Sequence, residues 1–375
     1  MMHYKFPEIR TINDVLPAIE GRPEFIVAER DFGKVINYMV SMPDTFKMES
    51  ADDTMGAIRR ECRGLIFDTE GNIMSRPYHK FFNVNEKEET QSHLLDLTRA
   101  HTVMDKLDGS MIRPIWMHDT VRLATKMGVT DIAIEAEKLL DYDQWTWLED
   151  MMVDSLTPIF EYVAPTNKIV VEYAEAKLIL TGVRENVSGE YRSLRQWNAP
   201  FEIVRTDSNV HDFDAYLAFK RGETNREGDI IRFADGHMIK IKNDWYVQIH
   251  KTKDIVRVDR NIVELVLNET IDDTRAVLDP SDLVRVDEVE ANFWKAFENV
   301  VGRLEGLELL ARTIYGADKK RIALELAPNL INKQDAGFIF KLIDGHDVRE
   351  LVLIHCKKSI GSTPKYDELM EWMKA

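Results

Sequence analysis

Residues 226–242 read REGDIIRFADGHMIKIK and contain the clearest structural signal in the chain. Two runs of strand-forming residues flank Asp235-Gly236, a dipeptide that favours a two-residue hairpin turn. Such a turn pairs Ile231 with Lys240 and Asp229 with Lys242. Because opposed residues of a hairpin share a face, one face is expected to hold carboxylates and lysines: Glu227, Asp229, Ile231, Lys240 and Lys242. The other face takes mainly apolar residues: Ile230, Arg232, Ile239 and Ile241.

The rest of the first 250 residues has the texture of strands and turns with a few helices. A hairpin is expected around Asp31-Phe32-Gly33, and a helix over 130–152. Further strands are expected at four places: 63–68, 103–116, 159–163 and 169–173.

From about residue 255 the pattern becomes helical. Apolar residues recur at spacings of three and four, which predicts one amphipathic helix: Val286, Val289, Phe293, Phe297, Val300 and Leu304. Shorter helices are expected near 319–327, 334–344, 346–357 and 365–374, with Gly345 as a stop between two of them. The fold class is therefore α+β: a domain of antiparallel sheets with flanking helices, residues 1–254, followed by an all-helical domain, residues 255–375.

Composition narrows the class of protein. The hydrophobic fraction of 44% and the charged fraction of 30% are ordinary for a soluble globular chain. No apolar run is long enough to cross a membrane, and the first ten residues lack a secretory signal. Cys62 and Cys356 are too few for a disulfide framework, and Cys62 is expected to be a small buried hydrophobe. A cytoplasmic protein is expected.

The net charge of −16 argues against a general nucleic-acid coat protein, which needs an excess of Lys and Arg. It does not exclude an enzyme that gathers positive charge in one cleft. Asp105-Lys106-Leu107-Asp108-Gly109-Ser110 supplies a candidate for such a site. The string has an ordinary alternative, a strand ending in an Asp-Gly turn, and the lysine hairpin alone could be a solvated face with weak ion pairs.

Seven motifs together give these residues a more specific meaning. In chain order they are Glu61-Cys62-Arg63-Gly64, Ser75-Arg76-Pro77-Tyr78-His79-Lys80-Phe81-Phe82-Asn83, Lys106-Leu107-Asp108-Gly109-Ser110, Phe160-Glu161-Tyr162-Val163-Ala164-Pro165-Thr166-Asn167, Arg184-Glu185-Asn186, Glu227-Gly228, and Lys240-Ile241-Lys242 with Asp244-Trp245-Tyr246. In content and order they resemble the phage RNA ligase 1 family, a branch of the covalent nucleotidyltransferases. Two positions depart from the family pattern: Leu107, where some relatives are acidic, and Asp229, where an apolar or aromatic residue is commoner.

The resemblance implies an ATP-dependent RNA ligase in which Lys106 attacks the α-phosphate of ATP and carries AMP. A free lysine has a pKa of about 10.4, and nearby cations favour the neutral, nucleophilic form of an amine. Lys240, Lys242 and a bound metal ion are expected to have this effect and to stabilise phosphate charge.

The same resemblance implies the other contacts to the nucleotide. Asp108 and Gly109 belong to the nucleophile motif, Glu161 receives the ribose hydroxyls, and Glu227 holds Mg²⁺ or Mn²⁺. Arg63 and Lys80 are expected to grip the β- and γ-phosphates. Phe82 is expected near the nucleotide, although an aromatic in such a pair is more often core. Lys126 aligns with another family lysine, and an exposed surface lysine is its alternative.

The implied substrate is RNA with a 5′-phosphate and a 3′-hydroxyl, and the helical tail implies nicked tRNA cleaved in the anticodon loop. Residues 313–375 hold ten Lys and Arg against nine Asp and Glu, with basic clusters at 319–321 and 357–358. These clusters are candidate phosphate contacts or ordinary helix surface. The chain is expected to act as a monomer, away from membranes and in the host cytoplasm if a phage encodes it. A DNA ligase, a capping guanylyltransferase and a non-catalytic RNA-binding relative are the alternatives.

Overall fold

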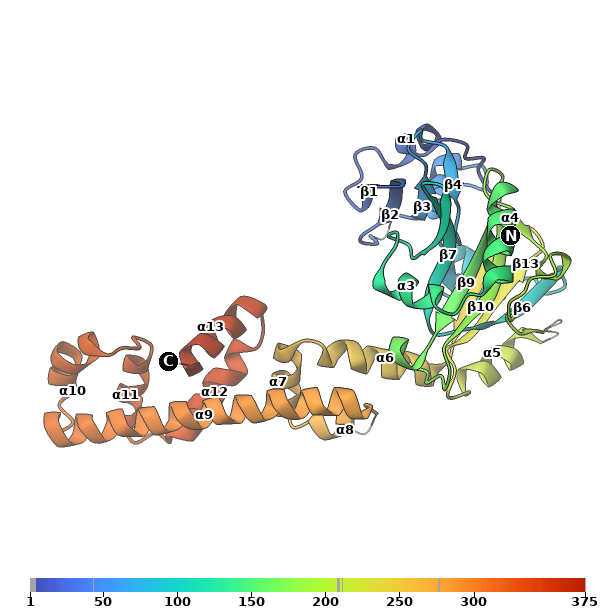
Figure 1. Ribbon diagram of the computed structural model, residues 1–375. Coiled ribbons are helices and arrows are strands. Elements are labelled where there is room, and N and C mark those ends of the chain that lie inside the picture. The colour runs from blue at the N-terminus through green and yellow to red at the C-terminus, as the bar shows by residue number, and fades with distance from the viewer. Residues whose placement is uncertain (1–4, 43, 208–209, 211, 276, 375) are drawn as a thin grey trace. The chain divides into compact units, whose positions relative to one another are not determined.

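The computed structural model describes residues 5–374 except 43, 208, 209, 211 and 276. The chain divides into two compact units, residues 1–248 and 249–375 (Figure 1). We refer to them as the N-terminal and the C-terminal unit. The first contains the sheets and the second only helices, as the sequence predicted, so the α+β class is confirmed.

The first sheet of the N-terminal unit has the strand order β1-β2-β3-β4. Its strands are β1 (Phe25–Arg30), β2 (Gly33–Tyr38), β3 (Arg63–Phe67) and β4 (Ile73–Ser75). Arg30 pairs with Gly33, so the predicted hairpin around Asp31-Phe32-Gly33 is confirmed. Helices α1 (Leu16–Ile19) and α2 (Thr54–Glu61) pack on this sheet through a core that includes Ile36, Ile58 and Leu65.

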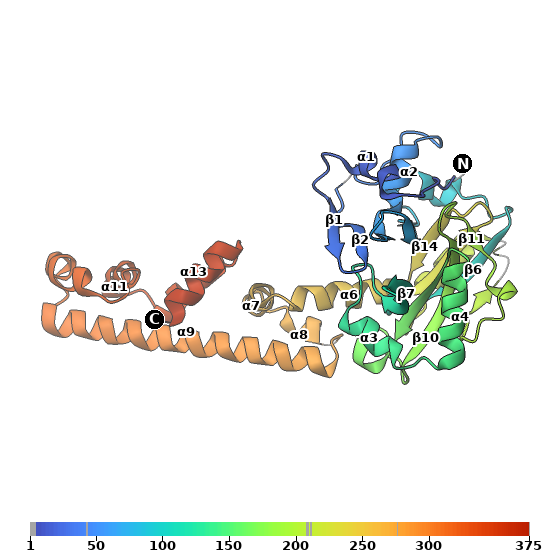
Figure 2. The same cartoon turned by 45° about the horizontal axis from the view of Figure 1, so that its top comes forward.

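The second sheet has the order β11-β10-β9-β7-β8. Its strands are β7 (Ser110–Met117), β8 (Thr120–Ala124), β9 (Leu156–Val163), β10 (Lys177–Glu185) and β11 (Tyr191–Arg192). Helices α3 (Asp131–Glu137) and α4 (Tyr142–Val153) replace the single helix expected over 130–152. Helix α4 packs on β9 and β7, where Leu148 and Phe160 are fully buried (Figures 1 and 2).

The third sheet has the order β12-β6-β13-β14-β5 and carries the residues of the candidate site. Its strands are β5 (Phe82–Asn83), β6 (His101–Lys106), β12 (Thr206–Asp207), β13 (Gly228–Phe233) and β14 (Met238–Lys242), with α5 (Phe213–Arg221) packed against it. The pairs are antiparallel except β14 with β5.

The predicted register of the β13–β14 hairpin is wrong by one residue. Ile230 pairs with Lys240 and Gly228 with Lys242. The loop has three residues, because the Phe233 amide donates to the His237 carbonyl and the Gly236 amide donates back to Phe233. Gly236 has a φ of +86°, as a three-residue hairpin loop with a left-handed third position requires.

Two other predictions for this unit need correction. The strand expected over 103–116 is two strands, β6 and β7, separated by 107–109. The segment 169–173 is not a strand, because the amides of Val170 and Val171 donate to the Asp108 carboxylate instead of to a neighbouring strand.

A fully buried ion cluster ties the first two sheets together. The Glu61 carboxylate, at the end of α2, accepts two 2.7 Å hydrogen bonds from Arg184 of β10 and one of 3.2 Å from Arg76. Burial opposes ionisation of Glu61, but Arg184 and Arg76 outweigh it and hold its pKa at about 2. Cys62, beside it, is buried, and burial raises the pKa of its thiol. These residues of the predicted motifs therefore build the scaffold beneath the site.

The C-terminal unit is helical. After α6 (Asp244–Val256), within which the division between the units falls, its helices are α7 (Asp259–Leu267), α8 (Ile271–Arg275), α9 (Pro280–Tyr315), α10 (Lys319–Arg321), α11 (Asp335–Ile343), α12 (Val348–Ser359) and α13 (Thr363–Lys374). The predicted apolar face of α9 is buried at Val286, Phe293 and Leu304. Gly345 lies between α11 and α12, as expected. Within the described residues, none of the helices is both long and apolar enough to cross a membrane.

Candidate active site

Three adjacent strands place Lys106, Gly228 and Lys242 in one row. Lys106 on β6 and Lys242 on β14 both pair with Gly228 of the central strand β13. The Glu227 carboxylate bridges the two amines, with Lys106 Nζ at 2.6 Å and Lys242 Nζ at 3.0 Å. The sequence-predicted nucleophile, carboxylate and second lysine therefore meet in the structure.

Only glycine fits at the centre of this row. Gly228 has a φ of +148°, and a Cβ there would lie 1.9 Å from the Ile241 carbonyl oxygen. The Glu227 carbonyl accepts a hydrogen bond from the Asn243 amide, just beyond β14. Gly228 thus allows the chain to enter β13 with the Glu227 side chain, which is 4% exposed, between the two lysines.

Lys240 lies in the next row, opposite Ile230, and faces the ring of Phe81 at 5.2 Å. Burial, followed by the charges of Lys106, Lys80 and Arg63, lowers the pKa of the Lys240 amine to about 7. Both the burial of this amine and the neighbouring cations disfavour its charged form.

Glu161 reaches the site from the second sheet. It lies on β9 opposite Met111 of β7, and its Oε1 accepts a 3.1 Å hydrogen bond from the Gly109 amide. Burial raises the pKa of Glu161 to about 7; the Glu227 charge acts in the same direction, and Lys106 and Arg63 oppose it. Glu227 is therefore close enough for its charge to disfavour ionisation of Glu161.

Asp108 is placed differently from its neighbours in the motif. Its carboxylate is 2% exposed and accepts hydrogen bonds from the amides of Val170 and Val171, both at 2.8 Å, and from the Tyr246 hydroxyl at 2.7 Å. All these partners belong to the protein. Asp108, predicted as a nucleotide-binding residue within the nucleophile motif, therefore positions the loop that follows Lys106.

Three predicted phosphate-binding residues gather around Tyr38. Lys80 Nζ lies 3.5 Å from its hydroxyl and 5.1 Å from its ring centre, and Lys126 Nζ lies 6.0 Å from the same ring. Burial opposes ionisation of Tyr38, but the charges of Lys80, Arg63 and Lys126 lower its pKa. Arg63 is half-buried and Lys126 exposed. The edge of the site is thus strongly cationic.

Phe82 occupies a core position, which was the alternative expected for it from the sequence. Its side chain is 3% exposed and lies among Phe46, Arg60, Lys80 and Lys87. Phe82 is therefore part of the core, and its neighbour Phe81 is the aromatic residue that faces Lys240.

The prediction that Asp229 lies beside Lys242 is wrong, as a consequence of the register. Asp229 is 1% exposed on the opposite face of β13. There it accepts from the Tyr216 hydroxyl at 2.7 Å and pairs with Lys220 at 3.1 Å and with Arg226. Arg226 also pairs with Asp105. This second polar cluster joins α5 to the sheet and stays outside the site.

The site's carboxylates suit a metal ion that arrives with phosphate ligands. Within the part of the chain that the structure describes, no three His, Cys, Asp or Glu side chains gather as a self-sufficient metal site. Mg²⁺ commonly uses one or two carboxylates, substrate phosphates and water. The charge of Glu227 disfavours ionisation of Glu161, and a divalent cation held by Glu227 would relieve that repulsion.

Some residues of the site were missed at the level of sequence. Tyr38 comes from a strand in which no motif was recognised. Only the structure shows that Lys80, Arg63 and Lys126 lie near it. Tyr246 lies in a recognised motif, yet its hydrogen bond to Asp108 links positions 138 residues apart. Phe81 was quoted in a motif, but the pair Phe81-Phe82 does not show which ring faces inward.

The chain is similar to several proteins described as RNA ligases. Residues 61–246 match a family model described as RNA ligase. The chain is 31% identical over 284 residues to the "Putative RNA ligase" of Thermovibrio ammonificans, covering 72% of each protein. It is 24% identical over 331 residues to RNA ligase 1 of bacteriophage TS2126, covering 82% of this chain and 72% of the phage protein. A solved archaeal ATP-dependent RNA ligase aligns with 88% of this chain and 95% of its own, at 12% identity and a TM-score of 0.47.

Proposed function

We propose that this chain, which belongs to the RNA ligase family, is an ATP-dependent enzyme that carries AMP on Lys106 and transfers it to an RNA 5′-phosphate. The observation that carries the proposal is the row in which Glu227 bridges Lys106 and Lys242 across three strands. A reactive amine needs a pocket that is rich in phosphate-binding cations and close to a carboxylate that can work with a metal ion. This row and its surroundings combine both.

In the first step the Lys106 amine attacks the α-phosphorus of ATP. A phosphorus–nitrogen bond forms as the amine gives up one proton to solvent, the bond from the α-phosphorus to the bridging oxygen breaks, and pyrophosphate leaves. A divalent cation bound by Glu227 would neutralise charge on the phosphate oxygens. Lys242 and Lys240 lie on the same face of the sheet and are proposed to stabilise the charge that develops on the α-phosphate.

The surrounding residues are proposed to hold the nucleotide. Arg63, Lys80 and Lys126 form the cationic edge that grips the β- and γ-phosphates and aligns pyrophosphate to leave in line. Glu161, whose Oε1 accepts a hydrogen bond from the Gly109 amide, is proposed to receive the ribose hydroxyls. Because the pKa of Lys240 is about 7, bound phosphate is expected to draw a proton onto this amine and so strengthen its own binding.

The second and third steps use the activated AMP. An RNA 5′-phosphate oxygen attacks the lysyl-linked phosphorus, which releases the Lys106 amine and gives an RNA with a 5′–5′ pyrophosphate linkage to AMP. A 3′-hydroxyl oxygen then attacks the RNA phosphorus, and AMP leaves as the strand is sealed. Activation is needed because AMP is a better leaving group than an oxide dianion.

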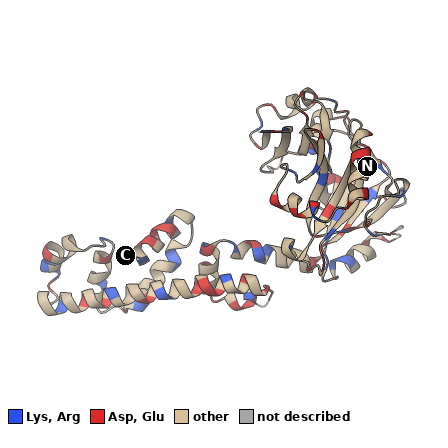
Figure 3. Cartoon of the chain, in the orientation of Figure 1, with Lys and Arg blue, Asp and Glu red and all other residues tan. Residues whose placement is uncertain are grey.

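The C-terminal unit is proposed to select the RNA, with nicked tRNA as the substrate and the monomer as the working form. We assign residues 1–254 to adenylyl transfer and 255–375 to RNA specificity. Figure 3 shows acidic and basic residues interspersed along α9. Within the basic clusters, Lys319 pairs with Asp344 and Arg321 with Glu325, whereas Lys320, Lys357 and Lys358 are exposed. These three lysines are the candidate phosphate contacts of this unit.

The test follows the label through the reaction. Wild type and Lys106→Ala are incubated with α-labelled ATP or GTP and a divalent metal ion, then offered 5′-phosphorylated single-stranded RNA or nicked duplex DNA. We expect label from ATP on the wild-type protein only, followed by RNA joining. Label retained from GTP alone, or joining confined to DNA, would replace this proposal with a capping-type enzyme or a DNA ligase. An unlabelled wild-type protein that joins neither substrate would favour a non-catalytic relative.

A further inference from the structure

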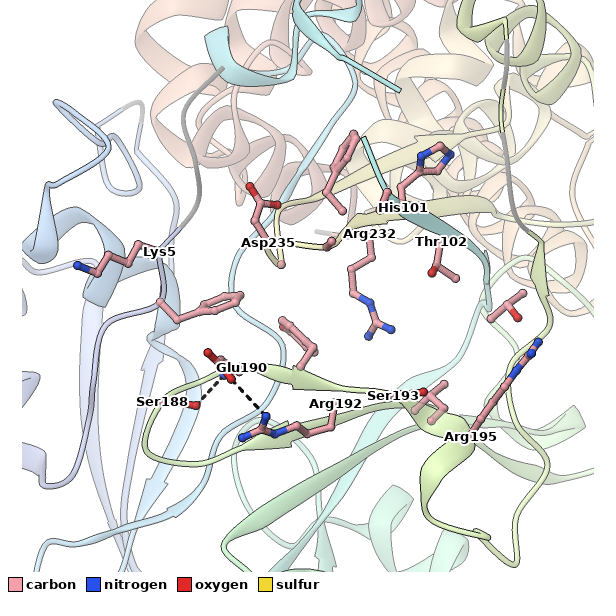
Figure 4. Close-up of a pocket in the computed structure, with 18 of the residues that line it drawn as sticks. Lys5, His101, Thr102, Ser188, Glu190, Arg192, Ser193, Arg195, Arg232 and Asp235 are labelled. Carbon is pink, nitrogen blue, oxygen red and sulfur yellow. Dashed lines mark hydrogen bonds and ion pairs between the residues drawn. The ribbon is translucent and has the colours of Figure 1, made fainter. Parts of the chain in front are cut away.

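A cavity of about 940 Å³ opens in the N-terminal unit between the start of β6, the end of β13 and β11 (Figure 4). It is large enough for a nucleotide, since small-ligand pockets commonly measure about 300–1,000 Å³. None of the residues assigned above to the nucleotide or to the metal lines it.

The cavity shares a face of the third sheet with the lysines but lies at the other end of the strands. Lys106 pairs with Gly228, and Thr102, which lines the cavity, pairs with Arg232. Four residues along a strand correspond to roughly 13 Å. Ile230, which lies between Gly228 and Arg232 on β13, packs against a small apolar cluster of Tyr78, Ile159 and Met238. The cavity is therefore a separate compartment and not an extension of the candidate active site.

Of the lining side chains that the structure describes, Arg232 is the one with a buried polar atom that lacks a hydrogen-bond partner. Figure 4 shows its guanidinium pointing into the cavity. Its Nη1 is buried and has no hydrogen-bond partner among the described residues, while the guanidinium carbon lies 5.5 Å from the ring centre of Tyr191. A charged donor buried without a partner is costly, so an anionic acceptor bound in the cavity would satisfy it.

The acidic groups that line the cavity already have basic partners. Glu190 pairs with Arg192 at 3.3 Å and Asp235 with Arg99 at 2.5 Å. Asp207 and Glu8 pair with other arginines. Arg195, in contrast, is exposed on the lining and has no ion-pair partner within the described part of the chain. The excess charge available to a ligand is therefore positive and comes from Arg232 and Arg195, with Lys5 exposed on the same lining.

We propose that this cavity binds a phosphodiester of the RNA strand whose end is presented to Lys106, with Arg232 as the buried phosphate contact and Arg195 as the outer one. The proposal rests on the proposed function, since it names where the RNA of that reaction is held. A guanidinium suits phosphate because its donors match two oxygens at once. The cavity lies roughly 13 Å along the strand from Lys106. Because a nucleic-acid strand rises about 3.4 Å per nucleotide, this distance corresponds to a few nucleotides.

The experiment measures RNA binding by full-length protein without ATP, using a fluorescent single-stranded RNA of about a dozen nucleotides over a range of salt concentrations. The variants are Arg232→Met and Arg195→Met. Arg221→Met is the matched control, because Arg221 is exposed on α5, packed on the other side of the sheet. Formation of lysyl-AMP from ATP is measured in parallel on every variant.

We expect Arg232→Met to weaken RNA binding roughly tenfold, as for one lost charged hydrogen-bonding contact. We expect the slope of log affinity against log salt to become shallower by about 0.7 for each arginine removed. Arg195→Met, whose exposed side chain is dispensable for folding, should show the same loss of slope, and all variants should form lysyl-AMP like wild type.

Unchanged RNA affinity and slope in both variants would overturn the proposal while leaving the proposed function untouched, provided that lysyl-AMP still forms. Titration with AMP and with inorganic phosphate separates the sources of the anion. If Arg232→Met weakened binding of either small anion but not of RNA, the cavity would hold a free ligand and the RNA assignment would be wrong. Failure of wild type to form lysyl-AMP would instead count against the proposed function.

Discussion

Two groups of charged residues in the N-terminal unit differ in how their charges are balanced. In the scaffold cluster, the Glu61 carboxylate accepts hydrogen bonds from Arg76 and Arg184, whose remaining donors reach backbone carbonyls such as those of Pro7 and Pro77. The pKa of Glu61 is accordingly low, at about 2. In the candidate active site, burial and like charges raise the pKa of Glu161 and lower that of Lys240, both to about 7.

The difference separates structural charges from reactive ones. In the scaffold, two arginines stabilise the charged form of Glu61, so the charges hold the sheets together. In the site, the surroundings disfavour the charged forms of Glu161 and Lys240, and a nucleotide with its metal ion would bring opposite charges to them. Residues of both kinds come from the same sequence motifs, so the motifs alone do not separate the two roles.

The largest effect on stability is expected from Glu61→Gln. Removing the carboxylate leaves two buried guanidinium groups without their counter-charge, which should lower the free energy of unfolding by roughly 3–5 kcal/mol. Denaturant unfolding followed by circular dichroism measures this directly. A stability equal to wild type would remove the distinction between scaffold and site.

Lys240→Met should reduce the rate of adenylation without reducing the stability of the fold. Loss of one preorganised charge-stabilising group should slow lysyl-AMP formation by about 10²–10³-fold. The fold should not weaken: the pKa of Lys240 is lowered, so its charged form costs stability, most fully below about pH 7 and not at all above the pKa of the unfolded chain. Single-turnover adenylation and thermal unfolding test both parts, and a destabilised variant at about pH 6 would show that Lys240 is structural.

A smaller, pH-dependent effect is expected from Glu161→Gln. The pKa of Glu161 is raised in the folded state, so wild type loses stability as the pH rises from about 4.5 through 7. At about pH 8 the variant should be more stable than wild type by about 1–3 kcal/mol, and near pH 4.5 the two should be equal. Adenylation should fall at both pH values. Equal stability of the variant and wild type across this range would mean that the folded protein does not disfavour the ionised form of Glu161.

The smallest effect is expected from Lys126→Ala, because Lys126 is exposed at the rim of the cationic edge. A solvent-exposed charge contributes about 1 kcal/mol or less, so KM for ATP should rise a few-fold with little change in kcat. Lys80→Ala is the comparison within the same edge and should cost more, since its amine lies among Tyr38, Phe46 and Phe82. If Lys126→Ala raised KM more than Lys80→Ala, the main phosphate contact would be Lys126 and not Lys80.

The sequence predicted the two-part fold and the meeting of Lys106, Glu227 and Lys242. Both predictions rest on the order of the motifs and on the pattern of strands and helices, and a register error of one residue changes neither. It did not predict the register of β13 and β14, since Asp235-Gly236 fits both a two-residue and a three-residue loop. That single residue moved Asp229 to the opposite face. The roles of Asp108 and Tyr38 depend on long-range partners, which local patterns do not contain.

The account depends most on Lys106 as the residue that accepts AMP. The direct measurement is peptide mass spectrometry of the purified full-length protein after incubation with ATP and a divalent metal ion. We predict one AMP per chain, attached to the peptide that contains Lys106 and released as RNA-adenylate when 5′-phosphorylated RNA is added. AMP on another lysine, or an adduct that persists in Lys106→Ala, would contradict the account.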